Sequence, residues 1–263
     1  MEFSKLSLIE SFNQYFQIEL ATSQAQVQKA QRIRYRVYCE ELGYEPVDKF
    51  PDGFETDEYD EQSLHILITH RRSGLAAGCV RLVPTSAFQP LLPLEKRFSD
   101  TLDPESLAVI DPDRSTRCEI SRLAVDPLFR RRPGEAGSRL GDIHAMDISR
   151  IEYRSFSLIA EAAFVAAAVL TDLAERTNVF ALMEPFLARL LGRSGIHFVR
   201  VGRDIKFHGR RAPYFVSTET VKQSLNSELL DFYWGLRDEL ARPYRSMLTN
   251  IESHSLESHS LAG

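Results

Sequence analysis

Cysteine is scarce in this chain of 263 residues, and its three copies lack the spacing of a metal site. Cys39, Cys79 and Cys118 are also odd in number, which argues against a disulfide framework. The most apolar stretch, residues 162–171, is about half as long as the roughly 20 residues of a membrane span. No apolar signal-peptide core follows the first residues. We therefore expect a soluble protein in a reducing compartment, the cytoplasm.

An excess of positive charge is absent as well. The 32 Lys and Arg residues face 37 Asp and Glu residues, and the net charge of −5 excludes a uniformly basic nucleic-acid coat. The charge is nevertheless segregated: residues 40–62 hold ten acids and one lysine, whereas residues 189–222 hold eight bases and two acids. The acidic segment favours an amine-bearing acceptor, and the basic segment favours a phosphorylated cofactor or an acidic protein.

Apolar periodicity predicts strands that alternate with helices. The expected strands cover residues 15–20, 63–70, 78–83, 116–125, 179–183, 197–201, 204–208 and 214–217. The expected helices cover residues 23–42, 157–177, 185–193 and 223–247. This order indicates one mixed α/β sheet with helices on both faces.

The other segments are predicted to be peripheral. Residues 86–115, rich in Pro and Asp, and residues 133–156, which lack any period, are expected insertions in one domain of residues 1–217. Residues 218–250 form an expected C-terminal helical extension. Residues 251–263 contain the repeated string Glu-Ser-His-Ser-Leu and are expected to be disordered.

Five blocks of polar and aromatic residues follow one another along the chain. They are RYRVY at 34–38, LGY at 42–44, ETDEYD at 55–60, GCVRLVPT at 78–85 and EISRLAV at 119–125. Together they resemble the acyl-homoserine-lactone (autoinducer) synthase family of GNAT-like acyltransferases. Tyr44 departs from that family's pattern, which has Trp at the matching position.

A closer resemblance is to the bacterial acyltransferase-like proteins encoded with PEP-CTERM/exosortase systems. It is carried by strings such as SLHILITHR, MEPFLARLL and HGRRAPY, and the whole resemblance covers residues 15–217. It implies a GNAT-like (acyl-CoA N-acyltransferase) mixed sheet flanked by helices, with insertions and the C-terminal helical extension.

Glu119 is the candidate catalytic residue. A partly desolvated carboxylate in a cleft can act as general base, and an amine that attacks a thioester must lose a proton. The resemblance gives the matching glutamate this role. The alternative is a structural salt bridge with Arg34, Arg81 or Arg122. Alternation along a strand places Glu119 and Arg122 on opposite faces of the sheet.

The resemblance also implies an ion-pair network beside the acceptor pocket. Its members here are Arg34, Asp57, Asp60, Arg81 and Arg122. Buried Arg–carboxylate pairs are geometrically specific but add little net stability. The alternative is that the two aspartates are exposed loop charges.

The acyl donor is expected to be acyl-CoA or an acyl carrier protein, used as a co-substrate, with no permanently bound cofactor and no metal. By resemblance, main-chain groups near Leu123 and Val125 would bind the thioester carbonyl, in a V-shaped gap between residues 120–125 and 179–183. Arg131, Arg132 and Gly134 fit a phosphate-binding loop. The alternative is a basic surface loop.

These observations predict an enzyme that moves an acyl group from a carrier-protein or CoA thioester to an amine of a small-molecule acceptor. The closer resemblance adds a link to exosortase or exopolysaccharide systems. Two other functions stay open. One is an N-acyl-homoserine-lactone synthase that uses S-adenosylmethionine, and the other is a non-catalytic acyl-binding or scaffold protein. We expect no nucleic-acid partner and no membrane span.

Overall fold

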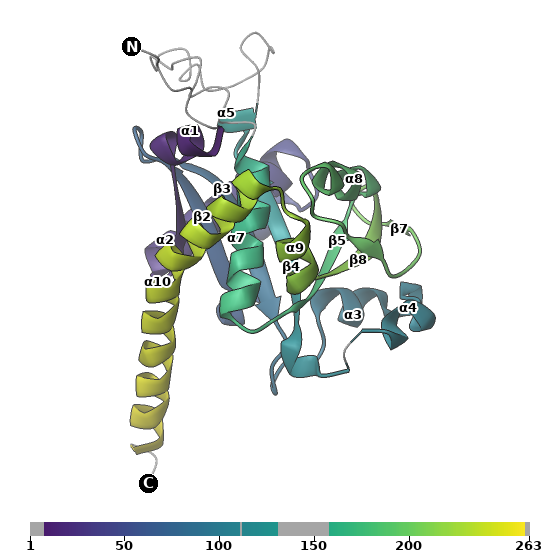
Figure 1. Ribbon diagram of the computed structural model, residues 1–263. Coiled ribbons are helices and arrows are strands. Elements are labelled where there is room, and N and C mark those ends of the chain that lie inside the picture. The colour runs from purple at the N-terminus through teal and green to yellow at the C-terminus, as the bar shows by residue number, and fades with distance from the viewer. Residues whose placement is uncertain (1–7, 111, 131–157, 261–263) are drawn as a thin grey trace, which may run out of the picture.

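A computed structural model describes residues 8–110, 112–130 and 158–260 of the chain (Figure 1). The strands are β1 (Phe16–Leu20), β2 (Leu64–His70), β3 (Ala76–Pro84), β4 (Arg117–Val125), β5 (Asn178–Met183), β6 (Val199–Arg200), β7 (Ile205–Lys206) and β8 (Arg210–Ser217). The α-helices are α1 (Leu8–Tyr15), α2 (Gln24–Arg34), α3 (Pro93–Phe98), α4 (Pro104–Ala108), α5 (Pro127–Arg130), α7 (Ile159–Leu173), α8 (Pro185–Arg193), α9 (Thr218–Ser224) and α10 (Ser227–Ser260). This order confirms the mixed α/β class.

One sheet organises the described residues. Its strand order is β1-β2-β3-β4-β5-β8-β6, and β7 pairs with β8 at the side. Neighbouring strands run antiparallel except for β4 and β5, which are parallel. The expected strands therefore lie in a single sheet, with the parallel pair at its centre.

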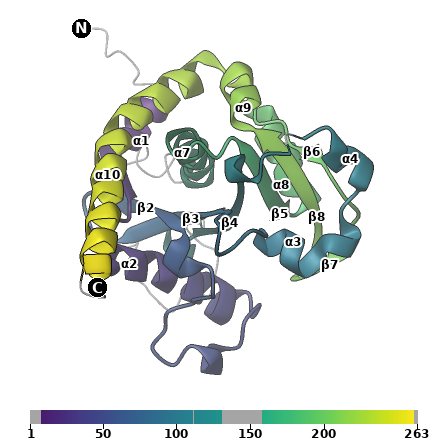
Figure 2. The same cartoon turned by 90° about the horizontal axis from the view of Figure 1, so that it is seen from below.

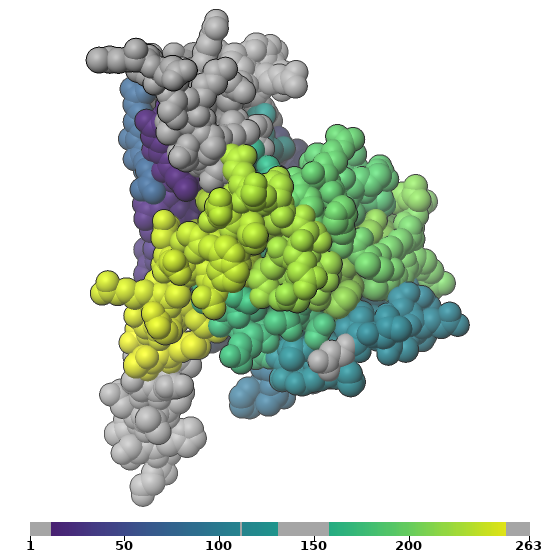
Figure 3. All heavy atoms as spheres, in the orientation of Figure 1, coloured from purple at the N-terminus to yellow at the C-terminus, as the bar shows by residue number. Residues whose placement is uncertain are grey.

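Helices cover both faces of this sheet, as Figure 2 shows for α2 on one side and α7 on the other. Helix α2 begins with a capping box in which the Ser23 and Gln26 side chains satisfy each other's backbone N–H groups. Helix α7 is apolar around most of its circumference because α10 packs against it. In the space-filling view, α9 and the first half of α10 lie on the outside, next to α7 (Figure 3).

The parallel pair separates after three residues. Arg117, Cys118 and Glu119 pair with residues 178–180 of β5, and no pairing is recorded beyond Glu119. From there β5 stays paired with β8 through Met183, so the two central strands diverge toward their C-terminal ends. This opening matches the expected V-shaped gap between residues 120–125 and 179–183.

A β-bulge reverses one prediction. Cys79 pairs with Ala124 and Arg81 with Ser121, so β4 has one more residue than β3 in this interval. The extra residue is accommodated at Arg122, whose φ of 54° lies in the left-handed region. Glu119 and Arg122 therefore line one pocket, and their predicted placement on opposite faces is wrong.

Two peripheral segments contain helical residues beyond those that the sequence predicts. Residues 86–115 contain α3 and α4, and buried Leu92, Leu94 and Ile110 form a small apolar cluster with Phe180 and Val201. Helix α10 continues to Ser260, which corrects the expected disorder for most of the tail. Residues 244–260 contain neither proline nor glycine, so nothing stops the helix from propagating out of its packed first half.

Three further findings concern absences in the described part of the chain. None of its helices is both long enough and apolar enough to cross a bilayer. It contains no group of three or more side chains arranged to hold a metal ion. The predicted insertion at 133–156 lies outside the described residues.

Candidate active site

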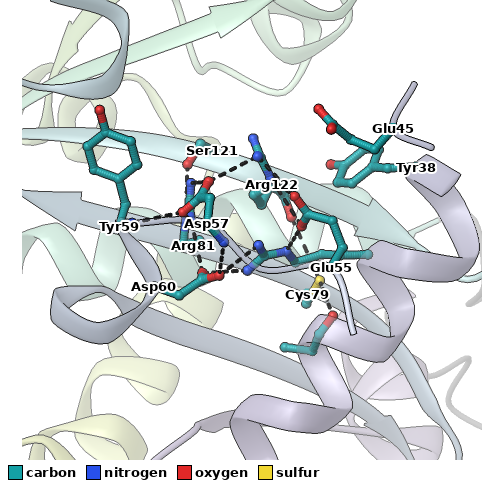
Figure 4. A network of polar contacts seen from close by, with 12 residues as sticks. Tyr38, Glu45, Glu55, Asp57, Tyr59, Asp60, Cys79, Arg81, Ser121 and Arg122 are labelled. Carbon is teal, nitrogen blue, oxygen red and sulfur yellow. Dashed lines mark hydrogen bonds and ion pairs between the residues drawn. The ribbon is translucent and has the colours of Figure 1, made fainter. Parts of the chain in front are cut away.

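Three arginines and three carboxylates meet at the centre of one sheet face. Arg34 ends α2, Arg81 lies on β3, and Arg122 lies at the bulge of β4. The carboxylates come from the acidic segment that crosses over these strands: Glu55, Asp57 and Asp60. Figure 4 shows the labelled members pointing toward one another.

The six side chains form a closed ring in which arginine and carboxylate alternate. Each arginine bonds two carboxylates, and each carboxylate bonds two arginines, so the ring carries no net charge. The contacts are Arg34–Glu55, Arg34–Asp60 (2.6 and 2.9 Å), Arg81–Asp60 (2.8 Å), Arg81–Asp57 (2.6 and 3.0 Å), Arg122–Asp57 (3.0 Å) and Arg122–Glu55 (3.0 Å). All five residues predicted for a network are in it.

Burial and charge together explain the ionisation of the ring. Arg34 is 0% exposed and Arg81 is 1% exposed. Burial alone raises the pKa of Asp60, but the hydrogen bond and charge of Arg34, with the charge of Arg81, bring it well below its ordinary range. At Asp57, burial likewise raises the pKa, but the hydrogen bond and charge of Arg81 outweigh it, so the pKa of Asp57 is also lowered. Both aspartates are therefore ionised at neutral pH.

Glu119 stands beside this ring at the point where β4 and β5 separate. The residue is only 5% exposed, and this burial raises the pKa of its carboxyl group to about 7. The N–H of Leu94 donates to Oε2 at 2.7 Å. None of the hydrogen bonds recorded in the described part of the chain uses Oε1. The residue is thus a carboxyl poised between its two protonation states at neutral pH.

Glu119 and part of the ring line one cavity of about 420 Å³. Its walls come from the π-helical turn that follows α2 (Tyr35–Glu41), the acidic segment, β3, α3, β4, β5 and the β7–β8 hairpin. Arg122 and Asp57 are the ring members with side chains most open to this cavity, at 28% and 22% exposure. The ring therefore forms the wall of a cavity large enough for a small molecule.

The sequence interpretation missed several residues of this cavity. Glu55 is the first residue of the quoted ETDEYD block, and its place in that block was the signal that could have identified it as a site residue. Tyr38 donates its hydroxyl hydrogen to the Leu123 carbonyl at 2.7 Å, and its aromatic position in RYRVY was visible too. Phe207 and His208 reach the cavity from the β7–β8 hairpin; His208 begins the quoted string HGRRAPY, whereas no pattern marked Phe207.

The expected donor-binding residues divide into two groups. Asp126 donates its N–H to Ala77 on β3, so alternation directs the main-chain groups of Val125 toward the side from which β5 has diverged. The Leu123 carbonyl accepts from Tyr38 and the Val125 carbonyl accepts from Arg130 at 2.8 Å. Arg131, Arg132 and Gly134 lie outside the described residues.

The cysteines are poor nucleophiles. All three are buried free thiols. Burial raises the pKa of Cys39 to about 11 and that of Cys79 to about 12, and it also raises the pKa of Cys118. They are protonated at neutral pH, and none of them lines the cavity.

Part of the sequence is similar to a known protein family and to a known synthase. Residues 33–138 match the model of the acetyltransferase (GNAT) domain. The chain is 34% identical over 95 residues to the acyl-homoserine-lactone synthase of Vibrio anguillarum. That match covers 36% of this chain and 45% of the relative, a little under half of its length. Both matches support an enzyme of the acyltransferase class.

Solved structures share the fold. TofI, solved in a ternary complex with an inhibitor and MTA, aligns with a TM-score of 0.55 at 20% identity over 82% of this chain and 99% of its own. BjaI, a CoA-dependent acyl-homoserine lactone synthase solved with SAM and isopentyl-CoA, aligns with a TM-score of 0.51 at 18% identity over 85% and 89%. At this level of identity the likeness establishes the fold alone.

Proposed function

We propose that this chain, which has the GNAT fold of the acyl-homoserine-lactone-synthase-like acyltransferases, moves an acyl group from a phosphopantetheine thioester to an amine. One observation carries the proposal. Glu119, with a pKa near 7, stands where the central strands part and lines a cavity walled by a charge-neutral ring. A base of that pKa suits proton transfer at neutral pH.

For an amine that enters in its neutral form, the chemistry balances with Glu119 as the protein group that accepts the proton. The amine nitrogen attacks the thioester carbonyl carbon, and Glu119 takes a proton from the attacking nitrogen. The tetrahedral intermediate then collapses, a C–N amide bond remains, and the C–S bond breaks. The departing thiolate takes up a proton, which Glu119 can return.

The ring holds the acceptor side of the cavity in place. Arg34 and Arg81 are buried and each is fixed by carboxylates on two sides, so they position the others. Of the ring members that line the cavity, Arg122 and Asp57 have the most exposed side chains and are best placed to touch an acceptor. A neutral, rigid wall of this kind orients a substrate without adding net charge.

The donor enters, in this proposal, through the opening between β4 and β5. Main-chain groups at Leu123 and Val125 would bind the thioester arm, and Arg131, Arg132 and Gly134 would bind its phosphates. Acyl-CoA and an acyl carrier protein both supply this arm. Helix α8 exposes Phe186 and Leu190 beside Arg189 and Arg193, and this surface is suited to an acidic carrier protein.

A second candidate is an acyl-homoserine-lactone synthase that takes its amine from S-adenosylmethionine. The match to the Vibrio anguillarum synthase favours it. Such an enzyme releases methylthioadenosine, which an amine-only acyltransferase does not. The link to exosortase systems concerns the acceptor's biological setting, and it stays a prediction.

The test is an acyl-transfer assay on the full chain. Octanoyl-CoA and octanoyl carrier protein would be offered with a panel of amines and with S-adenosylmethionine, while thiol release is followed and products are identified by mass spectrometry. We expect thiol release that depends on an amine. Glu119→Gln should lower kcat/KM roughly 10²- to 10⁴-fold.

Glu19→Gln is the matched control, because Glu19 is a half-buried strand glutamate on β1 of the same sheet. It should keep full activity. Methylthioadenosine among the products would select the second candidate. Tight binding of octanoyl-CoA without any amine-dependent thiol release would replace the enzyme with an acyl-binding protein.

A further inference from the structure

The acids that line the cavity are already matched by resident cations. Glu55 and Asp57 belong to the neutral ring. Glu58 pairs with Lys96 at 3.0 Å, and Glu45 pairs with Lys49 at 2.8 Å. Apart from Glu119, the base of the proposed reaction, no lining acid is left to receive a cationic ligand.

Two lining arginines have no such partner. Arg81 and Arg122 are ring members, but Arg97 on α3 and Arg211 on β8 meet no carboxylate in the part of the chain that the structure describes. Both border the β7–β8 hairpin: Arg97 lies 4.3 Å from the ring centroid of Phe207, and Arg211 donates to the His208 carbonyl at 3.4 Å. The cavity therefore has two uncompensated positive charges at one corner.

The aromatic walls do not offer a site for a second cation. Each phenyl or phenol ring that lines the cavity already has a cation of this chain over it. The pairs are Arg122 on Tyr38 (5.9 Å), Arg211 on Tyr44 (5.7 Å), Lys96 on Tyr59 (5.8 Å), and Arg97 on Phe98 (5.8 Å) and Phe207 (4.3 Å). A sulfonium or quaternary ammonium ligand would meet repulsion from these guanidinium and ammonium groups.

His208 lies at the same positive corner. Its ring stacks on Tyr44 with centroids 4.6 Å apart. Burial and the charges of Arg211, Arg97 and Arg122 lower its pKa, although Glu45 at 3.8 Å acts in the other direction. The imidazole is thus neutral at pH 7 and adds no third positive charge to this corner.

We propose that the acceptor carries an oxyanionic group, a carboxylate or a phosphate, which Arg97 and Arg211 bind while its amine reaches Glu119 in the same cavity. This inference rests on the proposed function and names its acceptor class. Guanidinium groups bind carboxylates and phosphates through charge-assisted, often bidentate hydrogen bonds. Amino acids and phosphorylated amines have both of the required groups.

The test measures binding without turnover, on the full chain, with probes that differ in the acid group alone. Titration calorimetry would compare the L-amino acids with their α-carboxamides, O-phosphoethanolamine with ethanolamine, and S-adenosylmethionine with all of them. We expect at least one acid to bind about 10- to 100-fold more tightly than its neutral partner. A carboxylate or phosphate preference would identify which oxyanion the corner takes.

Arg97→Gln/Arg211→Gln should remove this preference, and Arg210→Gln should keep it. Arg210 is adjacent in sequence but exposed and paired with Asp204. Arg97→Lys/Arg211→Lys, which retains both charges, should retain part of the preference. An unchanged melting temperature in each variant would show that the fold is intact.

Three results would overturn the inference. They are equal binding of acids and neutral partners, a preference that survives in the double Gln variant, and a double variant that raises the KM of acyl-CoA alone. Failure of the proposed function looks different. If neutral amines are acylated at the same rate as acids, the proposed function stands and the inference falls. If acids bind selectively but no thiol is released, the acid-binding site stands and the proposed function falls.

Discussion

At the scale of single residues, burial gives Glu119 its reactivity and also makes it costly to the fold. The carboxyl is nearly inaccessible, so ionising it inside the protein is less favourable than ionising it in water, and its pKa rises from 4.5 to about 7. The nearby charges of Arg81 and Arg122 partly offset this effect, and that of Asp57 adds to it. A residue selected only for a salt bridge would have the opposite shift.

The raised pKa predicts opposite effects of Glu119→Gln on activity and on stability. Wild-type kcat/KM should rise with pH through about 7, as Glu119 loses its proton, and the variant should lack this step. The effect on stability follows from proton linkage. Between about pH 4.5 and 7, Glu119 ionises in the unfolded chain but keeps its proton in the fold, so the wild type loses stability across this range. The full loss is present above pH 7. The variant should therefore be more stable at pH 8, by up to about 3 kcal/mol.

Urea unfolding at pH 5 and pH 8 checks the stability half of this prediction. The free-energy difference between Glu119→Gln and wild type should grow from pH 5 to pH 8. A variant that loses stability at pH 8 would mean that Glu119 serves as the anion of a structural pair, and its role as base would be abandoned.

At the scale of elements, the ring joins four parts of the chain that are distant in sequence. It ties the end of α2 to β3, to the bulge of β4 and to the acidic segment. Desolvating three pairs offsets much of their mutual attraction, so the ring is a device for position more than for net stability. Removing one member of the ring lowers the stability of the fold, because the charges of its former partners stay buried.

Asp60→Asn should therefore be strongly destabilising. Asp60 holds Arg34 at 2.6 Å and Arg81 at 2.8 Å, and its loss leaves each buried guanidinium with one carboxylate. We expect a loss of about 3–5 kcal/mol in urea unfolding at pH 7. Because the Asp60 pKa is lowered in the fold, the difference from wild type should shrink as the pH falls below about 3.8.

Glu58→Gln is the comparison variant for the ring. It removes an ion pair with Lys96 in the same segment, but both side chains are more than half exposed. Its unfolding curve should overlay that of the wild type. If Asp60→Asn also overlays it, the six-membered ring has no structural role.

The same scale shows why some features were predictable and others were not. Helix α7 and strands β2 and β3 follow from local apolar patterns, and the five motif blocks located all five network residues that were chosen. The bulge at Arg122 depends on the register between β4 and β3, which no single strand encodes. The convergence of Arg97 and Arg211 depends on how α3 packs beside a distant hairpin, so their spacing in sequence shows nothing of it.

At the scale of the whole molecule, the C-terminal helix is part of the core although it was predicted as an extension. Helix α10 buries Leu229, Phe232, Tyr233, Leu236 and Leu240 against α7 and the N-terminal elements. Phe12 and Phe232 meet edge to face with centroids 6.1 Å apart. Helix α1 and the first half of α10 therefore pack against each other.

Two truncations separate the buried half of α10 from the rest. Removing residues 227–263 exposes the apolar face of α7, and five large buried side chains at about 1.5–3 kcal/mol each equal the stability of a typical domain. This variant should show no cooperative thermal transition by circular dichroism. Removing residues 251–263 should leave the melting temperature within about 2 °C of wild type, because the last described side chain packed on the core is Met247. A cooperative transition in the longer truncation would show that the sheet and α7 form a complete core without α10.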